Sequence, residues 1–368
     1  MHQLYLSSIK VLDLTRVLAG PLCTMMLGDM GARVLKIERS RIGDDTREWG
    51  PPFDAAGRSA YYLSVNRNKW SVAADLDDPA DQAFVRELAA EADVVVDNFL
   101  PGALARRGLD PDTLLERHPR LIWCTISGFG RDSARVGYDF TVQAERGWMA
   151  ITGERDGDPM KVGVALADVI AGKDAAIAIL GALVGRNSGG SGPRRIVVSL
   201  AHSAAAALVN VAQNALVSGK DAERWGNAHP NLVPYQLFET LDRPIVVAVG
   251  NDAQWKRCAD ALDLSDLAAD SALDTNAGRL ADRERVVGRI ASRLRERPAS
   301  EWIRRLDTAG VPNGVVKSVL ESLREVECSP LTGVSPTVPG IVRYAPPALD
   351  EHGARVRATG WRAFERLP

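Results

Sequence analysis

The chain has 368 residues, of which 46% are hydrophobic and 25% are charged, as in an ordinary globular enzyme and unlike a disordered or fibrous protein. Its 45 Lys and Arg residues against 47 Asp and Glu residues give a formal net charge of −2. The chain therefore has no overall excess of positive charge with which to bind a nucleic acid or an anionic membrane. Because a single core rarely grows beyond about 250–300 residues, the length predicts two domains.

Strands and helices are predicted to alternate through the first third of the chain. The expected strands are Ile9–Leu14, Arg33–Glu38, Ser71–Asp75, Asp93–Asp97 and Leu121–Ser127, and the expected helices are Leu22–Met30, Pro79–Ala92 and Pro111–Arg117. This β-α-β alternation predicts an α/β fold with a doubly wound parallel sheet. No GxGxxG follows the first strand, so the pattern gives an NAD site little support.

Further helices are predicted at Thr141–Thr152, Gly172–Gly185 and His202–Val217, with a strand at Arg195–Leu200. The polar, turn-rich stretch Gly219–Pro234 indicates a connection into a second domain. That domain is expected to contain a strand at Ile245–Gly250 and helices at Asp252–Leu262, Arg279–Arg295 and Ala299–Ala309. Pro330–Ala348 has five prolines and no periodicity, which indicates an extended segment that returns across the surface.

Four cysteines, at positions 23, 124, 258 and 328, are far apart and form no CxxC pair, so neither a disulfide framework nor a zinc site is indicated. The five histidines have no metal-binding spacing, and neither GxSxG nor a Walker loop occurs. The N-terminus does not have the pattern of a signal peptide, and no window reaches the roughly 18 apolar residues of a membrane span. A cytoplasmic protein without a metal is expected.

The stretch Val162–Val169 contains one charged residue, Asp168, among seven Gly or aliphatic residues. Burying an unpaired carboxylate costs several kcal/mol, so a lone Asp in such surroundings is a candidate for chemistry. The alternative is a helix N-cap, because Asp is a preferred cap and a small-residue helical pattern follows from Val169. Spacing alone slightly favours the cap, and both roles remain open at this point.

In doubly wound sheets, ligands bind beyond the carboxyl ends of the strands. Arg39 and Arg106 follow predicted strands and would suit phosphate, although either could equally be a solvated surface residue. Asn98 and Asn66–Lys69 could donate hydrogen bonds to an amide-rich ligand, but spacing favours turns. Tyr138 could cover a bound ligand, and Asp139 is expected to cap the helix that it precedes.

Seven segments in the first 200 residues together resemble the class III CoA-transferase family, which contains formyl-CoA, carnitine and dicarboxylate CoA-transferases and the related α-methylacyl-CoA racemases. They are IKVLDLTRVLAGPLCTMMLGDMGARVLKIE, GDDTREW, NRNKWSVAADL, DVVVDNFLPGALARRG, ISGFG, GYDFTVQA and GVALADVIAG, and NAHPNLVPYQLFET and VGNDAQW extend the likeness into the second domain. Their order is that of the family.

The resemblance implies a fold and a set of site residues. It implies an interlocked homodimer in which both chain ends (residues 1–218 and 326–368) form a Rossmann-like CoA-binding domain and residues 219–325 form a smaller inserted α/β domain. It places the nucleophile at Asp168 and CoA contacts at Val17, Arg39, Ala74, Asn98, Phe99, Arg106 and Tyr138. Small-molecule acyl-CoA and carboxylic acid partners are implied, with neither NAD nor a metal.

The implied reaction is transfer of CoA from an acyl-CoA to a carboxylic acid. The Asp168 carboxylate would attack the thioester carbonyl to give a mixed anhydride and CoA thiolate, and the thiolate would then form an aspartyl-CoA thioester. The acceptor acid would take these two steps in reverse and leave as its CoA thioester. There are two alternatives. One is an acyl-CoA epimerase, which would exchange the α-proton of its substrate with deuterated water, and the other is a non-catalytic CoA-binding protein.

Three departures from the family pattern bear on the acceptor acid, on a possible lid and on the type of reaction. Oxalate-using members carry His and Gln where this chain has Arg16 and Leu18, which puts oxalate in doubt and suggests an acceptor with a second carboxylate, such as a succinyl-like acid. A loop at His229–Leu232 replaces the tetraglycine lid of the formyl-CoA enzyme, so a lid role stays open. Racemases would have His where Tyr138 stands, which favours transfer.

Overall fold

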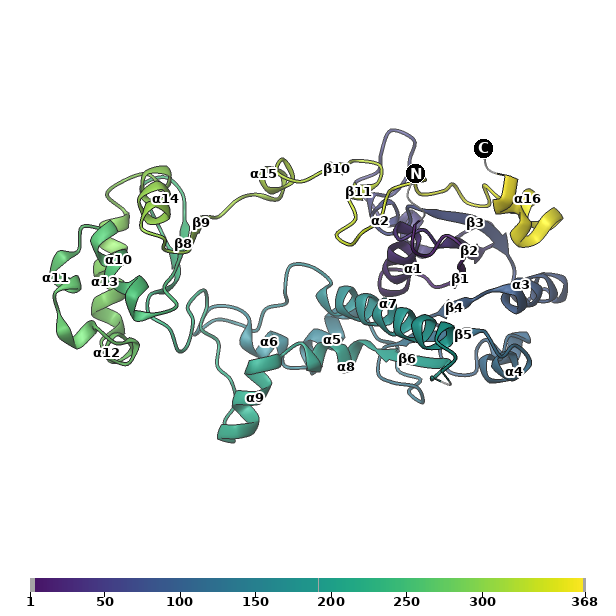
Figure 1. The fold of residues 1–368 in the computed structure, drawn as a ribbon, viewed down its shortest axis with the longest axis horizontal. Coiled ribbons are helices and arrows are strands. Elements are labelled where there is room, and N and C mark those ends of the chain that lie inside the picture. The colour runs from purple at the N-terminus through teal and green to yellow at the C-terminus, as the bar shows by residue number, and fades with distance from the viewer. Residues whose placement is uncertain (1–3, 191, 367–368) are drawn as a thin grey trace. The chain divides into compact units, whose positions relative to one another are not determined.

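The computed structural model describes residues 4–190 and 192–366 and divides the chain into two compact units (Figure 1). The first unit contains the chain up to Met149, Lys161–Lys220 and the chain from Val326 onward, and the second contains Ala150–Met160 and Asp221–Glu325. Residues 150–160, which the sequence assigned to the larger domain, therefore join the second unit. Arg224 explains this placement, because its guanidinium donates to the carbonyls of Ala150, Glu154 and Gly157.

A six-stranded sheet in the order β3-β2-β1-β4-β5-β6 forms the centre of the first unit, and every neighbouring pair is parallel. The strands are β1 (Lys10–Leu14), β2 (Arg33–Arg39), β3 (Lys69–Ala74), β4 (Val94–Asp97), β5 (Ile122–Ser127) and β6 (Arg195–Ser199). The predicted α/β class with a parallel sheet is confirmed. The strand order reverses between β1 and β4, where ligands bind in such folds.

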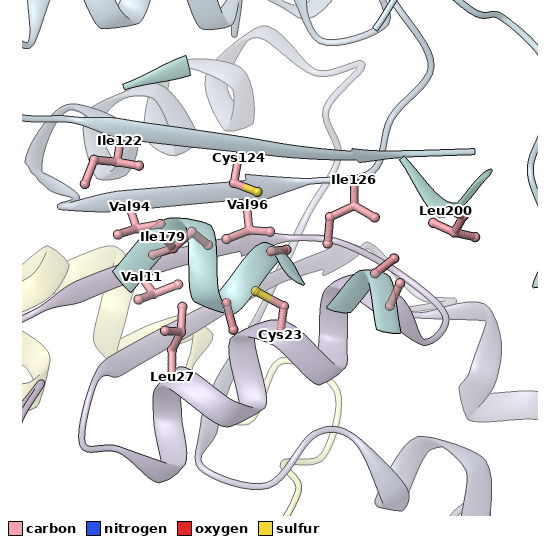
Figure 2. Packing of buried hydrophobic residues seen from close by; sticks show 14 of the residues in the cluster. Val11, Cys23, Leu27, Val94, Val96, Ile122, Cys124, Ile126, Ile179 and Leu200 are labelled. Atoms are coloured by element: carbon pink, nitrogen blue, oxygen red, sulfur yellow. The ribbon is translucent and has the colours of Figure 1, made fainter. Parts of the chain in front are cut away.

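Helices cover both faces of this sheet. On one face, α1 (Ala19–Asp29), α7 (Leu166–Asn187) and α8 (Leu200–Ala206) pack against alternate residues of the strands. Figure 2 shows this core, where side chains from β1, β4 and β5 meet Cys23 and Leu27 of α1 and Ile179 of α7. The predicted helix Gly172–Gly185 is longer than expected, because small buried residues continue its inner face back to Ala167.

Close packing between α1 and α7 depends on one glycine. A Cβ atom at Gly172 would lie 2.5 Å from the carbonyl oxygen of Ala19, well inside van der Waals contact. The side chains of Ala171, Ala175 and Ala176 are also buried, so α7 presents a narrow surface to α1. This approach places the second turn of α7 against Ala19 at the start of α1, and Ala19 and Asp168 line one cavity.

The other face of the sheet is covered by α3 (Pro79–Glu91), α4 (Pro111–Arg117), α16 (Gly353–Thr359) and η4 (Gly360–Arg366). Figure 1 shows the yellow C-terminal helices beside β3, at the edge of the sheet. Trp361 is buried there and its indole nitrogen donates to the carbonyl of Leu88 at 2.9 Å. The end of the chain therefore contributes to the same core as the N-terminal strands.

Arg67 and Asn68 hold the proline-rich return segment against the first unit. The Arg67 guanidinium pairs with Asp29 at 2.7 Å and also donates to the carbonyl of Thr332. The Asn68 amide donates to the carbonyl of Ile341 at 2.8 Å and accepts from the backbone N–H of Arg343. Arg67 and Asn68 do lie in a turn, as the spacing predicted, but both side chains are buried and tie the returning chain to the sheet.

Three predicted helices are broken. Thr141–Thr152 divides into α5 (Asp139–Glu145) and α6 (Trp148–Ile151) around Gly147, which has a positive φ of 83°. His202–Val217 divides into α8 and α9 (Val209–Ser218), and Arg279–Arg295 divides into α12 (Asn276–Ala281) and α13 (Arg283–Leu294). Within residues 4–190 and 192–366 no single helix is long and apolar enough to cross a membrane, and only α8 and α9 together reach that length and hydropathy, bent by 72°.

An antiparallel sheet of three strands, β7 (Tyr235–Phe238), β8 (Ile245–Ala248) and β9 (Asn313–Val315), lies in the second unit. It packs with α10 (Asp252–Ala261), α11 (Ser265–Ala268), α13 and α14 (Ala299–Thr308) around Trp255 and Trp302. The remaining short elements of the chain are η1 (Asp45–Glu48), α2 (Ala60–Ser64), η2 (Ala105–Arg107), η3 (Ser271–Leu273), α15 (Val319–Leu323), β10 (Cys328–Ser329) and β11 (Gly333–Val334).

Side chains of the second unit fix the loop at residues 229–232. The Arg283 guanidinium donates to the carbonyls of His229 and Pro230 at 3.1 and 2.7 Å. The Asn276 amide donates to the carbonyl of Asn231 at 2.8 Å. These bonds give the loop a defined conformation in the unit to which it belongs.

Candidate active site

Asp168 is the third residue of α7 and lies in its first turn. The N-cap residue of the helix is Ala165, which supplies no side-chain hydrogen bond. The expectation that Asp168 itself caps the helix is therefore wrong, because the helix begins earlier, at Leu166. The carboxylate is half-buried.

Side chains of α5 hold the chain that leads into α7. The Asp139 carboxylate accepts the backbone N–H of Ala167 at 2.8 Å and the Gln143 amide at 2.6 Å. Gln143 also accepts the backbone N–H of Val162 at 2.8 Å. Asp139 was expected to cap its own helix, but Tyr138 is the N-cap of α5 and Asp139 instead satisfies the first turn of α7. The position of Asp168 is therefore fixed from a neighbouring helix.

The electrostatic surroundings of Asp168 raise its pKa. Burial raises the pKa from 3.8 to about 7, and the carboxylate of Asp139 adds to the effect. The helix dipole acts in the opposite direction, but a charge in the first turn gains only about 0.3–1 kcal/mol. One pKa unit corresponds to about 1.4 kcal/mol, so desolvation dominates. A carboxyl poised near neutral pH is typical of functional sites.

A cavity of about 460 Å³ contains Asp168 in its wall. The structure brings seven other predicted site residues to the same cavity: Arg16, Val17, Leu18, Asn98, Phe99, Arg106 and Tyr138. These residues come from the loops after β1, β4 and β5 and from η2, as expected for the switch point of a parallel sheet. The cavity is large enough for part of a drug-sized ligand.

Arg39 and Ala74 line a second cavity, of about 400 Å³, rather than the one that contains Asp168. The two cavities share Arg16, Phe99 and Arg107 in their walls. The predicted residues therefore form two neighbouring groups. A long ligand could extend from one cavity to the other past these three side chains.

The loop between β1 and α1 is held by Asn98. Its amide oxygen accepts the backbone N–H of Arg16 at 3.1 Å, and its amide nitrogen donates to the carbonyl of Arg16 at 2.8 Å. Val17 follows with a φ of 73°, a conformation that is rare for a β-branched residue and costs on the order of 1–3 kcal/mol. The Asn98 amide therefore shapes the cavity wall through the backbone.

Asp45 connects the two cavities. Its carboxylate lies 3.1 Å from the Arg16 guanidinium and also pairs with Arg39. The Arg16 guanidinium lies 5.9 Å from the centre of the Phe99 ring. Two guanidinium groups therefore share one partly exposed carboxylate, and guanidinium groups bind carboxylates and phosphates well.

Several side chains at the site were not singled out by the residue patterns. Burial raises the pKa of Tyr61 to about 12, and the carboxylates of Asp168 and Asp139 add to the effect, so Tyr61 belongs to the same electrostatic environment. Tyr61 gave no signal in the sequence, and Gln143 lies in the segment GYDFTVQA, which supported the resemblance without a role for this residue. Asp44 and Asp45 lie in the segment GDDTREW, which supported the resemblance without an assigned role.

Metal-binding groups are not evident in the described part of the chain, where no cluster of three or more His, Cys, Asp or Glu side chains could hold an ion. Cys23, Cys124 and Cys258 are buried free thiols, and Cys328 is exposed. The wall of the cavity around Asp168 offers carboxylate, guanidinium and amide side chains.

Comparisons with known proteins agree with this geometry. Residues 6–335 match the sequence profile described as CoA-transferase family III. The human succinyl-CoA:glutarate CoA-transferase is 40% identical over an alignment that covers 95% of this chain and 85% of the human protein. The succinate–glutarate CoA-transferase of Agrobacterium fabrum is 42% identical over 324 residues, covering 86% and 81% of the two chains. A crystal structure of a CAIB/BAIF family protein from Brucella suis superposes with a TM-score of 0.86 and 37% identity, covering 97% of this chain and 99% of that one.

Proposed function

This chain belongs to CoA-transferase family III, and on that premise we propose that it transfers coenzyme A between dicarboxylic acids, with succinyl-CoA as donor and glutarate or a similar acid as acceptor. The observation that carries the proposal is the placement of Asp168, with a pKa of about 7, in a cavity that also contains Arg16 and Arg106. The two relatives described above, whose names give succinate and glutarate substrates, support the choice of acids.

Asp168 acts as the nucleophile in this proposal. Its ionised carboxylate attacks the thioester carbonyl of the donor, which forms a mixed anhydride and releases CoA thiolate. The thiolate then attacks the aspartyl carbonyl, so that the donor acid leaves and an aspartyl-CoA thioester remains. The acceptor acid reverses both steps, leaving Asp168 free again. Each step conserves the energy of the thioester as long as water is excluded.

Oxyanions formed in these steps need hydrogen-bond donors. The N-cap residue of α1 is Leu18, which provides no side-chain acceptor to the first turn of that helix. Leu18, Ala19 and Asp168 line the same cavity. We assign the backbone N–H groups of Ala19 and Gly20 as oxyanion donors, because N–H groups at a helix start have no partner within the helix and need no reorganisation. Pro21 has no N–H, and the Leu22 N–H donates to the carbonyl of Leu18.

The arginines divide the remaining tasks. Arg39 and Arg106 are assigned to the phosphates and adenine end of CoA, because guanidinium groups form charge-assisted bonds with phosphate. Arg16 is assigned to the distal carboxylate of the acid, since it lies at the boundary of the two cavities. Val17, Ala74, Asn98, Phe99 and Tyr138 are assigned to the walls that hold CoA, and Leu18 to the acid side.

Assembly as an interlocked homodimer is part of the proposal. Large apolar side chains of the first unit are exposed in the single chain, including Ile177 and Val184 of α7, at 67% and 66%, and Leu216 of α9, at 78%. Such exposed apolar residues favour burial against another chain. Light scattering should give twice the mass of the chain, and tagged and untagged interlocked dimers should exchange subunits only after unfolding.

We assign the reaction to the cytoplasm.

A test of the proposed function combines turnover and adduct detection. The protein is incubated with succinyl-CoA and glutarate, and glutaryl-CoA is measured by liquid chromatography. With succinyl-CoA alone, mass spectrometry should find CoA attached to the peptide that contains Asp168. Asp168→Ala should lose turnover by about a thousandfold or more and give no adduct. Full activity in that variant would overturn the mechanism, and deuterium incorporation from heavy water at the α-carbon would indicate an epimerase.

A further inference from the structure

Two opposite charges, Lys36 of β2 and Asp44, have fully buried side chains beside the second cavity, whose wall includes Asp44, and they have no part in the proposed reaction. The Lys36 ammonium and the Asp44 carboxylate are 2.9 Å apart, and both side chains are 0% exposed. The Lys36 ammonium also donates to the carbonyl of Thr15 at 2.7 Å. The other Asp44 oxygen accepts the backbone N–H of Val17 at 3.3 Å. The pair therefore contacts the loop between β1 and α1 at two points.

Val17 needs such support, because its φ of 73° is unfavourable for a β-branched side chain. A residue keeps a conformation of this kind only where the surrounding structure determines it. The residues before it are held separately: the Thr15 N–H donates to Asp13 at 2.9 Å, and Asn98 holds both backbone groups of Arg16. The Asp44 contact is the one that acts on the backbone of Val17 directly.

We propose that the buried Lys36–Asp44 pair is a positioning device that holds Val17 in its left-handed conformation and thereby shapes the wall against which acyl-CoA binds. Val17 and Leu18 line the cavity that contains Asp168, and Leu18 begins α1. A change in φ at Val17 would move this wall and the first turn of α1 together. The inference rests on the proposed function, because it concerns the binding of the same substrate.

Packing alone does not explain the pair. Apolar side chains of similar volume would fill the space at least as well as two buried charges, whose desolvation is costly, but they would offer no acceptor to Val17. Burial alone would raise the pKa of Asp44, yet the Lys36 ammonium and bonds from Thr46 hold it below its ordinary value. Asp44 is therefore charged at neutral pH. One of its oxygens accepts the Val17 N–H, and the other accepts the Lys36 ammonium.

Two matched double variants separate the hydrogen bond from the ion pair. Lys36→Met with Asp44→Asn and Lys36→Met with Asp44→Ala both remove the charges and the contact with Thr15. The asparagine double variant keeps an oxygen that can accept the Val17 N–H, whereas the alanine double variant does not. We expect the alanine double variant to have a KM for succinyl-CoA about fivefold to tenfold higher than the asparagine double variant, with kcat changed less than about threefold. Its melting temperature should be lower, because the Asp44 oxygen that accepts the Val17 N–H is also the N-cap acceptor for the Thr46 N–H of η1.

Glycine at position 17 provides the rescue. Because glycine adopts a positive φ without steric cost, adding Val17→Gly to the alanine double variant should lower its KM back towards that of the asparagine double variant. Equal KM values in the two double variants, or no recovery with glycine, would overturn the inference. If instead the wild-type protein showed no CoA transfer, the proposed function would fail first, so the two failures are distinguishable.

A stability measurement covers the case in which the double variants do not fold. Val17→Gly and Val17→Ala are compared in the otherwise unchanged chain. Relief of the strained φ predicts a higher melting temperature for Val17→Gly, although glycine is normally the less stabilising of the two residues. A higher melting temperature for Val17→Ala would show that Val17 is not strained, and the inference would be withdrawn.

Discussion

The carboxylate of Asp139 accepts the backbone N–H of Ala167 at 2.8 Å, one residue before Asp168. A side chain of α5 thus completes the first turn of α7 and places a second negative charge beside Asp168. These two effects act on different properties of the site. The hydrogen bond stabilises the start of the helix, whereas the charge contributes to the raised pKa of Asp168. Substitutions at this position can separate them.

Asp139→Asn should shift the acidic limb of the rate profile. Asp168 must be ionised to attack the thioester, so kcat/KM should fall as the pH decreases through about 7 in the wild-type protein. Asparagine keeps an oxygen for the Ala167 N–H but removes the negative charge, which lowers the pKa of Asp168. The limb should therefore move to lower pH. The measurement is kcat/KM for succinyl-CoA between pH 5 and pH 9. An acidic limb whose midpoint stays at the same pH, or moves to higher pH, would contradict the role of Asp139.

Asp139→Ala is the companion variant. It removes both the charge and the acceptor for the Ala167 N–H, and loss of a helix cap costs about 1 kcal/mol. We expect the same acidic shift as for asparagine, together with a lower free energy of unfolding. Equal stability of the two variants would show that the hydrogen bond does not hold α7.

Asp168→Asn should stabilise the protein at neutral pH while it abolishes turnover. A carboxyl whose pKa is about 7 when folded and 3.8 when unfolded binds protons more readily in the folded state, so its contribution to stability is lost as the pH rises between those values. Complete burial would make this cost about 4 kcal/mol, and solvent at the half-buried group reduces it to about 2 kcal/mol. The asparagine variant should gain that amount at pH 8.

Urea unfolding at pH 8 and pH 5 measures this gain. It should be smaller at pH 5, because the carboxyl of the folded wild-type protein is then largely protonated and carries little buried charge. Asp174→Asn is the control on the same helix. That carboxylate accepts the hydroxyl of Ser203 at 2.6 Å, so its replacement should give no gain. A wild-type protein as stable as Asp168→Asn at pH 8 would show that the site is not strained by the charge.

Most of the sheet and the grouping of the site were predictable from the sequence, for a physical reason. Alternating apolar runs indicated the parallel strands, and the carboxyl ends of parallel strands lie at one edge. Residues as far apart as Arg16, Asn98 and Tyr138 therefore line one cavity. Asp168 was detectable because a charge among seven small or aliphatic neighbours is costly to bury.

The parts that were not predictable depend on contacts between elements. Asp139 caps α7 rather than its own helix because of tertiary packing, which no local spacing encodes. Likewise, Lys36 interrupts a strand pattern as a solvated lysine would, yet it is fully buried against Asp44. The helix break at Gly147, where φ is positive, was not predicted either. The turn at Asn68 was predicted, but its burial against the carbonyl of Ile341 depends on the returning chain and not on local spacing.

Arg16→Met should reduce discrimination between dicarboxylic and monocarboxylic acceptors. If the Arg16 guanidinium binds the distal carboxylate, its loss should lower kcat/KM for glutarate about tenfold to a hundredfold and change that for butyrate little. Arg107→Met is the matched control, because Arg107 lines the same two cavities and is likewise paired with a carboxylate, that of Asp77 at 2.8 Å, but is not assigned to the acid. That variant should affect the two acids equally. A constant ratio of glutarate to butyrate turnover in Arg16→Met would rule out the assigned role.

Gly172→Ala should destabilise the protein and impair CoA transfer together. The new Cβ would lie 2.5 Å from the carbonyl oxygen of Ala19, so α1 and α7 must separate, at a cost of about 1–3 kcal/mol. This movement also displaces Asp168 from the first turn of α1. Gly288→Ala in α13 is the control, because its Cβ meets no atom within 4 Å, and it should gain about 0.5–1 kcal/mol. Denaturant unfolding and turnover of both variants provide the test, and a stable, fully active Gly172→Ala variant would contradict the close approach of the two helices.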